Sequence, residues 1–316
     1  MLNEKLLHEL KDFADLIRVV AGEKKIQPQL IEKDYWIMHC LYGLQQQGFA
    51  FELKGGTSLS KGFRIIERFS EDIDVRIEPP PKMGVKFGRN HTKPAQIESR
   101  RLFFDWLAEK IHIPGIISVK RDHGFDNKVF TSAGIRLAYP SVFSSVDGLK
   151  QGILLEVGFD DTTPNEEMDI SSWALDKAIA VHEKVVINKA LAVRCYNPAY
   201  TLVEKLQAVS TKFRKQQESD GFPANFLRHY YDIYCLLADP RVLEFIGTDT
   251  YEQRKAERFP TADIRRIAEN EAFLLNDPTV FELYKTEYAK TADLYYAGMV
   301  PFDSILERIR LHFDSL

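Results

Sequence analysis

The sequence of 316 residues contains few cysteines, no long apolar run and little excess charge of either sign. Its three cysteines, Cys40, Cys195 and Cys235, are too few and too scattered for a disulfide framework, so we expect a reducing, cytoplasmic location. No apolar run approaches the roughly 18 residues that a membrane span requires, so we expect no membrane partner. Charged residues interrupt positions 1–22, so we expect no signal peptide there.

Several catalytic motifs are also missing. The eight histidines form no His-Glu-x-x-His motif and no Cys/His set with zinc spacing. No Gly-x-Ser-x-Gly elbow is present, which argues against a serine hydrolase of that kind. A P-loop is excluded because Lys61 precedes Gly62 and no Ser or Thr follows a Gly-Lys pair.

The net charge of −4 argues at first against a nucleic-acid partner. The charge is uneven, however, because the segment from Arg76 to Arg101 has seven basic residues and only two acidic ones. Contacts from Lys and Arg to phosphate dominate nucleic-acid affinity, so this segment predicts RNA binding. The candidate RNA-binding side chains are Lys82, Lys86, Arg89 and Lys93. A solvated loop with no partner would have the same composition, and both interpretations stay open.

Length and composition predict two globular domains, since 45% of residues are hydrophobic and 28% are charged. We expect an α+β fold, with a mixed α/β domain over residues 1–170 and a mainly helical domain over 171–316. The periodicity of apolar residues predicts helices over 2–22, 28–47, 59–68 and 95–112, with strands at 49–53 and 73–77 and antiparallel strands within 116–159. It predicts further helices from Thr201 and over 223–238, 261–275, 278–291 and 301–314, with a polar connector at 160–169.

The most informative segment runs from Lys54 to Ile77. It begins with Lys54, Gly55, Gly56, Thr57 and Ser58, directly after a predicted strand and before a predicted helix. Glycines in such a turn let backbone amides approach the oxygens of a phosphate group. The next strand places Asp72 and Asp74 on one face, where two carboxylates can hold one or two Mg²⁺ ions.

Together the two elements predict a site for a nucleoside triphosphate and a metal that assists phosphoryl-type transfer. Each element alone has an ordinary explanation, as a tight turn or as the solvated face of a strand. The pairing carries the prediction, because the intervening chain is long enough for a short helix that returns the second strand beside the first.

These residues resemble the nucleotidyltransferase fold shared with DNA polymerase β, whose signature is Gly-Ser/Thr followed by an Asp-x-Asp/Glu strand. More narrowly, GGTSL and RFSEDIDV look like the AbiEii/AbiGii toxin family of prokaryotic nucleotidyltransferases. Three more stretches fit that family: Ile31–Trp36, Leu202–Ala208 and Arg228–Tyr234. The resemblance covers residues 30–237, and no motif is placed after them.

The resemblance implies a polymerase-β-like domain with a small mixed sheet, followed by a helical domain that completes the cleft. It implies an enzyme dependent on Mg²⁺ or Mn²⁺ that moves a nucleotide from an NTP to RNA, with the 3′ end of tRNA as the expected acceptor. It also implies a toxin of a toxin–antitoxin or phage-defence (abortive infection) pair, with a cognate antitoxin as partner. Lys54–Ser58 would bind the nucleotide, and Asp72 and Asp74 would hold the metal.

Two residues of the helical half receive roles from the same resemblance. Lys205 matches a lysine expected to contact the triphosphate, although a surface lysine with its stem on the apolar face explains it equally well. Asp232 matches an acidic residue with a catalytic or organising role. Its ordinary explanation is an i,i+4 ion pair with Arg228.

Two further positions stay open. Polymerase-β-like folds often carry a third carboxylate on a neighbouring strand, and Glu156 suits that metal-binding role, while a solvent-facing strand glutamate is the alternative. Lys33 and Asp34 lie on a predicted helix and receive no chemistry. Helix packing or a bridge between the domains is the preferred interpretation.

Alternatives to RNA transfer also remain. The same site could transfer a nucleotide to a small molecule or a protein, or could bind an NTP without turnover as part of a partner complex.

Overall fold

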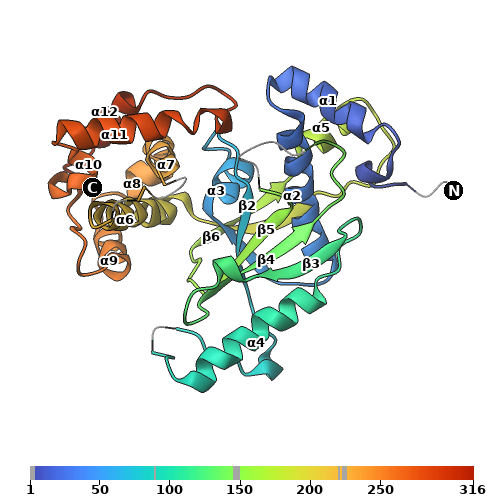
Figure 1. The fold of residues 1–316 in the computed structure, drawn as a ribbon, viewed down its shortest axis with the longest axis horizontal. Helices are drawn as coiled ribbons and strands as arrows, with labels where there is room; N and C mark the ends of the chain where they lie inside the picture. The colour runs from blue at the N-terminus through green and yellow to red at the C-terminus, as the bar shows by residue number, and fades with distance from the viewer. Residues whose placement is uncertain (1–3, 89, 145–149, 220, 223–225) are drawn as a thin grey trace. The chain divides into compact units, whose positions relative to one another are not determined.

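The computed structural model describes residues 4–88, 90–144, 150–219, 221–222 and 226–316, and it divides into two compact units (Figure 1). The first unit comprises Met1–Gly62 and Ser70–Tyr196, and the second comprises Phe63–Phe69 and Asn197–Leu316. The first unit therefore extends beyond residue 170, where the sequence places the division. None of the helices in the described ranges is long and apolar enough to cross a membrane.

A mixed sheet is the centre of the first unit. The described residues form seven strands in the order β3-β4-β5-β2-β1-β7-β6. The strands are β1 (Phe51–Lys54), β2 (Asp72–Ile77), β3 (Ser118–Asp122), β4 (Ser132–Ala138), β5 (Ile153–Gly158), β6 (Asn165–Ile170) and β7 (Ala190–Tyr196). Strand β2 pairs antiparallel with β1 and parallel with β5, so the metal-binding candidates lie in the middle of the sheet.

Alternation along β2 separates a buried face of the sheet from a polar one. Ile73, Val75 and Ile77 are fully buried, whereas Asp72 and Asp74 share the opposite, partly exposed face. Successive side chains of a strand point to opposite faces, so this alternation directs both carboxylates away from the apolar core. The predicted strand at 73–77 and the two-carboxylate face are thus confirmed.

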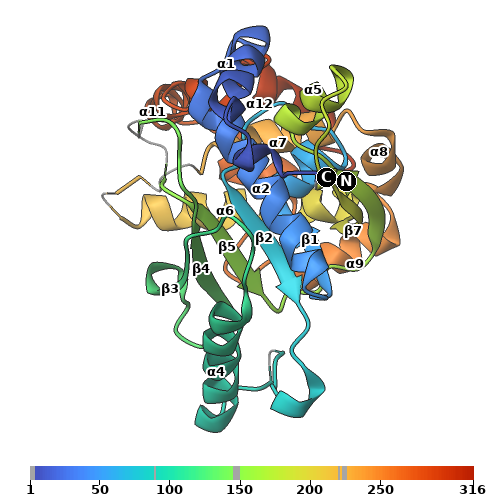
Figure 2. The same ribbon diagram turned by 90° about the vertical axis from the view of Figure 1, so that its right-hand side faces the viewer.

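Helices cover the sheet of the first unit. They are η1 (Leu7–Glu9), α1 (Phe13–Lys24), α2 (Pro28–Gln46), α3 (Gly55–Thr57), η2 (Ser58–Gly62), η3 (Pro81–Met83), α4 (Pro94–Lys110), η4 (His123–Phe125) and α5 (Trp173–Ala180). Helix α2 begins at Pro28, a residue suited to the first helical position because its missing N–H needs no partner there. It runs across the sheet in Figure 2 and packs against β5 and β7. Nearly all of its length is buried.

The second unit is helical. Its elements are α6 (Pro198–Gln217), α7 (Arg228–Leu236), α8 (Pro240–Phe245), α9 (Asp249–Arg258), η5 (Ile267–Glu269), α10 (Glu271–Leu274), α11 (Pro278–Ala289), η6 (Ala292–Leu294) and α12 (Phe302–Leu311). Helix α6 packs against α7, α8 and α9. Aromatic side chains fill the core around Tyr230, whose ring lies 5.3 Å from the ring of Phe302. The predicted α+β class, with a mixed sheet followed by a mainly helical half, is confirmed.

Four local predictions were wrong. The predicted helix at 2–22 is a 3₁₀ turn and then α1, because Leu10 adopts an extended backbone. The predicted helix at 59–68 stops at Gly62, and the chain then runs irregularly, with Arg64 at a φ of 56°. Most of the predicted helix at 261–275 consists of short turns. Strands β6 and β7 take the place of the polar connector and of part of the predicted helical half, since cross-strand pairing with distant residues stabilises them.

Helix α6 also begins earlier than the capping box at Thr201 predicts. Asn197 is the N-cap, because its side chain accepts the backbone N–H of Ala199. The Thr201 hydroxyl instead donates to the Asn197 carbonyl oxygen. A better cap therefore precedes the predicted one by one helical turn.

Candidate functional site

Charged side chains from three adjacent strands meet in register on the polar face of the sheet. Asp74 lies opposite Lys54 of β1 and opposite Glu156 of β5. Asp72 precedes this row by two positions and shares its face. The structure therefore brings Lys54, Asp72, Asp74 and Glu156 together, although Glu156 is far from the others in sequence.

The carboxylates influence one another. Burial, followed by the nearby charge of Asp74, raises the pKa of Glu156 to about 7. The ammonium of Lys54 opposes this increase, and it also forms an ion pair of 3.0 Å with Asp160. A glutamate in this state is easily protonated near neutral pH, and a bound cation would favour its charged form.

The turn before α3 is fitted closely to Asp74. Gly55 has a φ of +72°, and a Cβ atom built there would lie 2.0 Å from Asp74 Oδ2. Only glycine satisfies both conditions without moving the carboxylate. The Thr57 hydroxyl donates to the Asp72 carbonyl oxygen at 2.6 Å, so the turn and β2 hold each other in place.

The rest of the predicted phosphate-binding segment is more buried than a simple turn would be. Gly56, Thr57 and Ser58 are buried, and the Ser58 hydroxyl faces the thiol of Cys195 on β7. The helical run ends at Gly62 after one π-helical turn, so a long helix dipole does not contribute here. The segment therefore offers backbone amides rather than the end of a long helix.

The donor chemistry of these residues fits a hard divalent cation. All three carboxylates supply oxygen atoms, and Asp72 Oδ1 is buried with no hydrogen-bond partner among the described residues. In that same part of the chain, no three His, Cys, Asp or Glu side chains are gathered closely enough to form a metal site. The residues thus supply suitable ligands without a closed coordination shell.

The segment Ile31–Trp36, to which the sequence assigns no chemistry, holds three distant parts of the first unit. Glu32 accepts hydrogen bonds from Ser141 and from the backbone of Val142. Asp34 accepts the backbone N–H of Trp173 at the start of α5 and pairs with Lys61 of η2. Every such partner lies in the first unit, so these contacts do not bridge the two units.

Lys33 contacts two residues that lie next to the carboxylates. Its ammonium lies 3.2 Å from Glu71 Oε2 and donates to the Lys150 carbonyl oxygen at 2.7 Å. Glu71 immediately precedes Asp72, and the Lys150 ammonium lies 3.7 Å from Asp72 Oδ2. Sequence reasoning missed Glu71 and Lys150. Glu71 stands within the RFSEDIDV motif, but nothing local marks Lys150.

A second charged cluster lies inside the helical unit. Arg68 donates two hydrogen bonds, of 2.6 and 2.7 Å, to the two carboxylate oxygens of Asp232. The Lys205 ammonium lies 3.0 Å from Asp232 Oδ2. All three side chains are at least nine-tenths buried. Burial opposes ionisation of Asp232, but the two cations outweigh it and hold its pKa well below the usual value.

The cluster contains more positive than negative charge. Burial lowers the pKa of His229 well below its usual value, and the charge of Lys205 lowers it further, so the ring is neutral at pH 7. Its Nδ1 and Nε2 atoms lie 3.4 Å from the ammonium of Lys205 and 3.1 Å from that of Lys212. A neutral ring has one acceptor nitrogen, so it can accept a hydrogen bond from only one of them at a time. Sequence reasoning missed Arg68 and His229, both of which lie inside quoted motifs.

The basic segment after β2 is only partly available to a ligand. Arg76 pairs with Glu78, and Arg101 pairs with Glu98. Arg100 is buried and donates to backbone carbonyls, so it organises the loop. Three of the predicted RNA-binding residues are exposed: Lys82, Lys86 and Lys93. The fourth, Arg89, lies outside the described residues.

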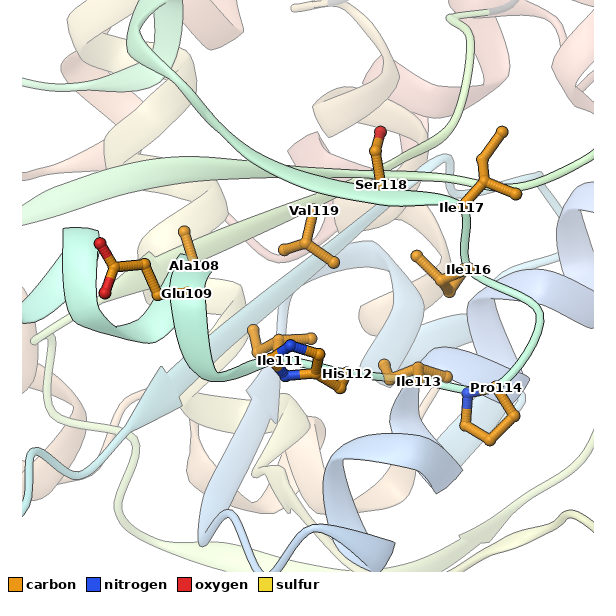
Figure 3. Close-up of a pocket in the computed structure, with 10 residues that line it drawn as sticks. All are labelled: Ala108, Glu109, Ile111, His112, Ile113, Pro114, Ile116, Ile117, Ser118 and Val119. Carbon is orange, nitrogen blue, oxygen red and sulfur yellow. The ribbon is translucent and has the colours of Figure 1, made fainter.

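A cavity of about 530 Å³ lies between the end of α4 and the start of β3. Figure 3 shows its lining, which runs from Ala108 to Val119. Four isoleucines line it together with polar residues that include Glu109 and His112, and none of the lining residues comes from β1, β2 or β5. This cavity is therefore separate from Asp72, Asp74 and Glu156.

Comparison with known proteins identifies the class. A family model described as "Nucleotidyl transferase AbiEii toxin, Type IV TA system" matches residues 39–308, which places the chain among the nucleotidyltransferases. The chain belongs to the AbiEii toxin family, whose members are toxins of type IV toxin–antitoxin systems. The predicted family and enzyme class are thereby confirmed.

Other comparisons add little. The chain is similar to a solved antigenic nucleotidyltransferase-like protein from Paracoccidioides brasiliensis, with 14% identity, a TM-score of 0.38, and coverage of 80% of this chain and 93% of that one. No curated protein matches the chain.

Proposed function

We propose that this toxin nucleotidyltransferase transfers a nucleoside monophosphate from an NTP to RNA, with the 3′ end of tRNA as the expected acceptor. The register of Asp74 with Glu156, beside Asp72 and the Gly55 turn, is the observation that supports this proposal. Carboxylates and phosphate-binding amides on one sheet face are the parts that nucleotide transfer requires.

Asp72, Asp74 and Glu156 would hold Mg²⁺ or Mn²⁺. When bound, the metal would neutralise charge on the triphosphate and lower the pKa of the attacking hydroxyl. Backbone amides of Gly56–Ser58 would bind phosphate oxygens, and Lys54 would contribute positive charge beside them. Pyrophosphate would then leave. Positioning and electrostatics would supply most of the rate, as in other phosphoryl transfers.

Two parts of the proposal rest on the family resemblance or on composition. Lys205 would contact the triphosphate, and Asp232 would keep that ammonium oriented, which its buried ion pair of 3.0 Å supports. The exposed side chains of Lys82, Lys86 and Lys93 would bind the backbone of the RNA.

Labelled NTPs test the proposal. The purified chain is incubated with each labelled NTP and total RNA, with and without Mg²⁺, and RNA ends are sequenced. We expect Mg²⁺-dependent incorporation at RNA 3′ ends, and we expect Asp72→Asn to reduce it more than about 100-fold. Asp15→Asn, at an exposed position of α1, is the matched control and should keep full activity.

A parallel reaction with a metabolite extract identifies other acceptors. Label on a small molecule and none on RNA would replace the proposed acceptor. Full activity of Asp72→Asn, with its fold preserved by circular dichroism, would refute the assignment of the site itself.

A further inference from the structure

Lys150 has no role in the site as described so far, yet its side chain lies beside the carboxylates. Its ammonium is 3.7 Å from Asp72 Oδ2, which is too long for a hydrogen bond, and 5.2 Å from the centre of the Phe125 ring. The side chain is 40% exposed. A cation is thus held near the polar face of the sheet without being enclosed by it.

The backbone of Lys150 is fixed more firmly than its side chain. Its carbonyl oxygen accepts a hydrogen bond of 2.7 Å from the Lys33 ammonium, and its N–H donates to Glu71 Oε2 at 3.3 Å. Lys33 and Glu71 also pair with each other at 3.2 Å. The Lys33–Glu71 ion pair therefore forms hydrogen bonds with both the N–H and the carbonyl oxygen of Lys150.

This ion pair is buried, with side-chain exposures of 1% for Lys33 and 7% for Glu71. Burial lowers the pKa of Lys33, although the charge of Glu71 opposes the decrease. Removing two charges from water is costly, and apolar residues of similar size are often at least as stabilising. Stability alone is therefore a weak reason for the pair. Its direct structural effect is to connect the residue before Asp72 to the backbone of Lys150.

We propose that Lys150 binds a phosphate oxygen of the NTP, and that Lys33 and Glu71 are positioning residues that hold it over Asp72. The proposal rests on the nucleotide site proposed above. With a metal cation at Asp72, the like charge of the Lys150 ammonium would be repelled, and the ammonium would no longer stay beside Asp72. The nearest strongly anionic group would then be the triphosphate, to which a flexible lysine can donate as a point charge.

Nucleotide affinity tests the role of Lys150. Binding of ATP, GTP, CTP and UTP is measured by calorimetry with Mg²⁺ and again with a chelator. We expect Lys150→Met to weaken binding about 10- to 100-fold, the usual range for a hydrogen bond to a charged group. Lys150→Arg should retain most of the affinity. Lys120→Met, at an exposed position of β3, is the control and should bind like the wild type.

A second series tests the positioning role. In the double variant Lys33→Met with Glu71→Leu, apolar side chains replace both charges together, so the fold should survive while NTP affinity falls as far as in Lys150→Met. Adding Lys150→Met to that variant should cause no further loss. Wild-type affinity in the double variant, or an additive loss in the triple variant, would overturn the positioning role.

The outcomes separate this proposal from the proposed function. A wild-type chain that binds no NTP would overturn both. A wild-type chain that binds an NTP, with equal affinity in Lys150→Met, would overturn the role of Lys150 alone and leave the nucleotide site intact.

Discussion

The raised pKa of Glu156 predicts how stability depends on pH when no metal is present. A carboxyl group with a pKa of about 7 in the folded chain and the usual 4.5 in the unfolded chain stabilises the fold below pH 4.5. This stabilisation is lost as the pH rises through 7. At about 1.4 kcal/mol for each pKa unit, the difference corresponds to about 3 kcal/mol at most. Glu156→Gln has no such dependence, because its amide does not titrate.

Thermal unfolding of both proteins in a chelator, from pH 4 to pH 8, measures this difference. The Tm of Glu156→Gln relative to the wild type should increase by about 6–12 °C across that range, since each kcal/mol moves the Tm of a chain of this size by about 2–4 °C. Glu167→Gln, at an exposed strand position, is the control. A Tm difference that does not change with pH would show that Glu156 is not forced toward its neutral form by its neighbours.

Adding Mg²⁺ should reverse the order of the Tm values of the wild type and Glu156→Gln. At pH 8, Mg²⁺ should raise the Tm of the wild type more than that of Glu156→Gln, because binding to the folded state stabilises it. Equal increases would show that Glu156 is not a ligand.

Four further substitutions have predicted outcomes. Gly55→Ala should abolish nucleotide transfer and lower stability by more than about 1 kcal/mol, because of its positive φ and the carboxylate 2.0 Å from the new Cβ. Gly22→Ala, in α1 with no atom within 4 Å of the new Cβ, should instead stabilise the chain by about 0.5–1 kcal/mol in urea unfolding. Arg68→Met should cost about 3–5 kcal/mol in the same assay, since it deprives a buried carboxylate of two hydrogen bonds. Lys205→Met should weaken NTP binding about tenfold or more in calorimetry, whereas the exposed Lys215→Met should not.

Local patterns in the sequence were sufficient for the parts of the site that are contiguous. Alternation along 73–77 predicted β2 and the shared face of Asp72 and Asp74, and the glycines predicted the turn. The helix predicted at 28–47 is α2 almost residue for residue. In each case the periodicity lies within one element, so no knowledge of distant partners is needed.

The remaining parts depend on partners far away in the chain. Strand β7 pairs in parallel with β1, and its exposed Leu191 and the positive φ of Ala192 weaken any alternating pattern. The segment 63–69 leaves the first unit and carries Arg68 to Asp232, 164 positions away. Helical periodicity in 59–68 gave no sign of this, because the same apolar residues pack equally well along an irregular path.

The contacts of α2 have a consequence for synthesis of the toxin. Glu32, Lys33 and Asp34 each have a hydrogen-bond partner 109 to 139 positions further along the chain, and β1 gains its second neighbour only at β7. A ribosome-bound chain that ends before Trp173 therefore contains the glycine turn, both aspartates and β5, but it lacks β7, the parallel neighbour of β1. The sheet around these residues is therefore complete only after β7 has been synthesised, so the N-terminal half of the chain cannot finish folding until residue 196 has emerged.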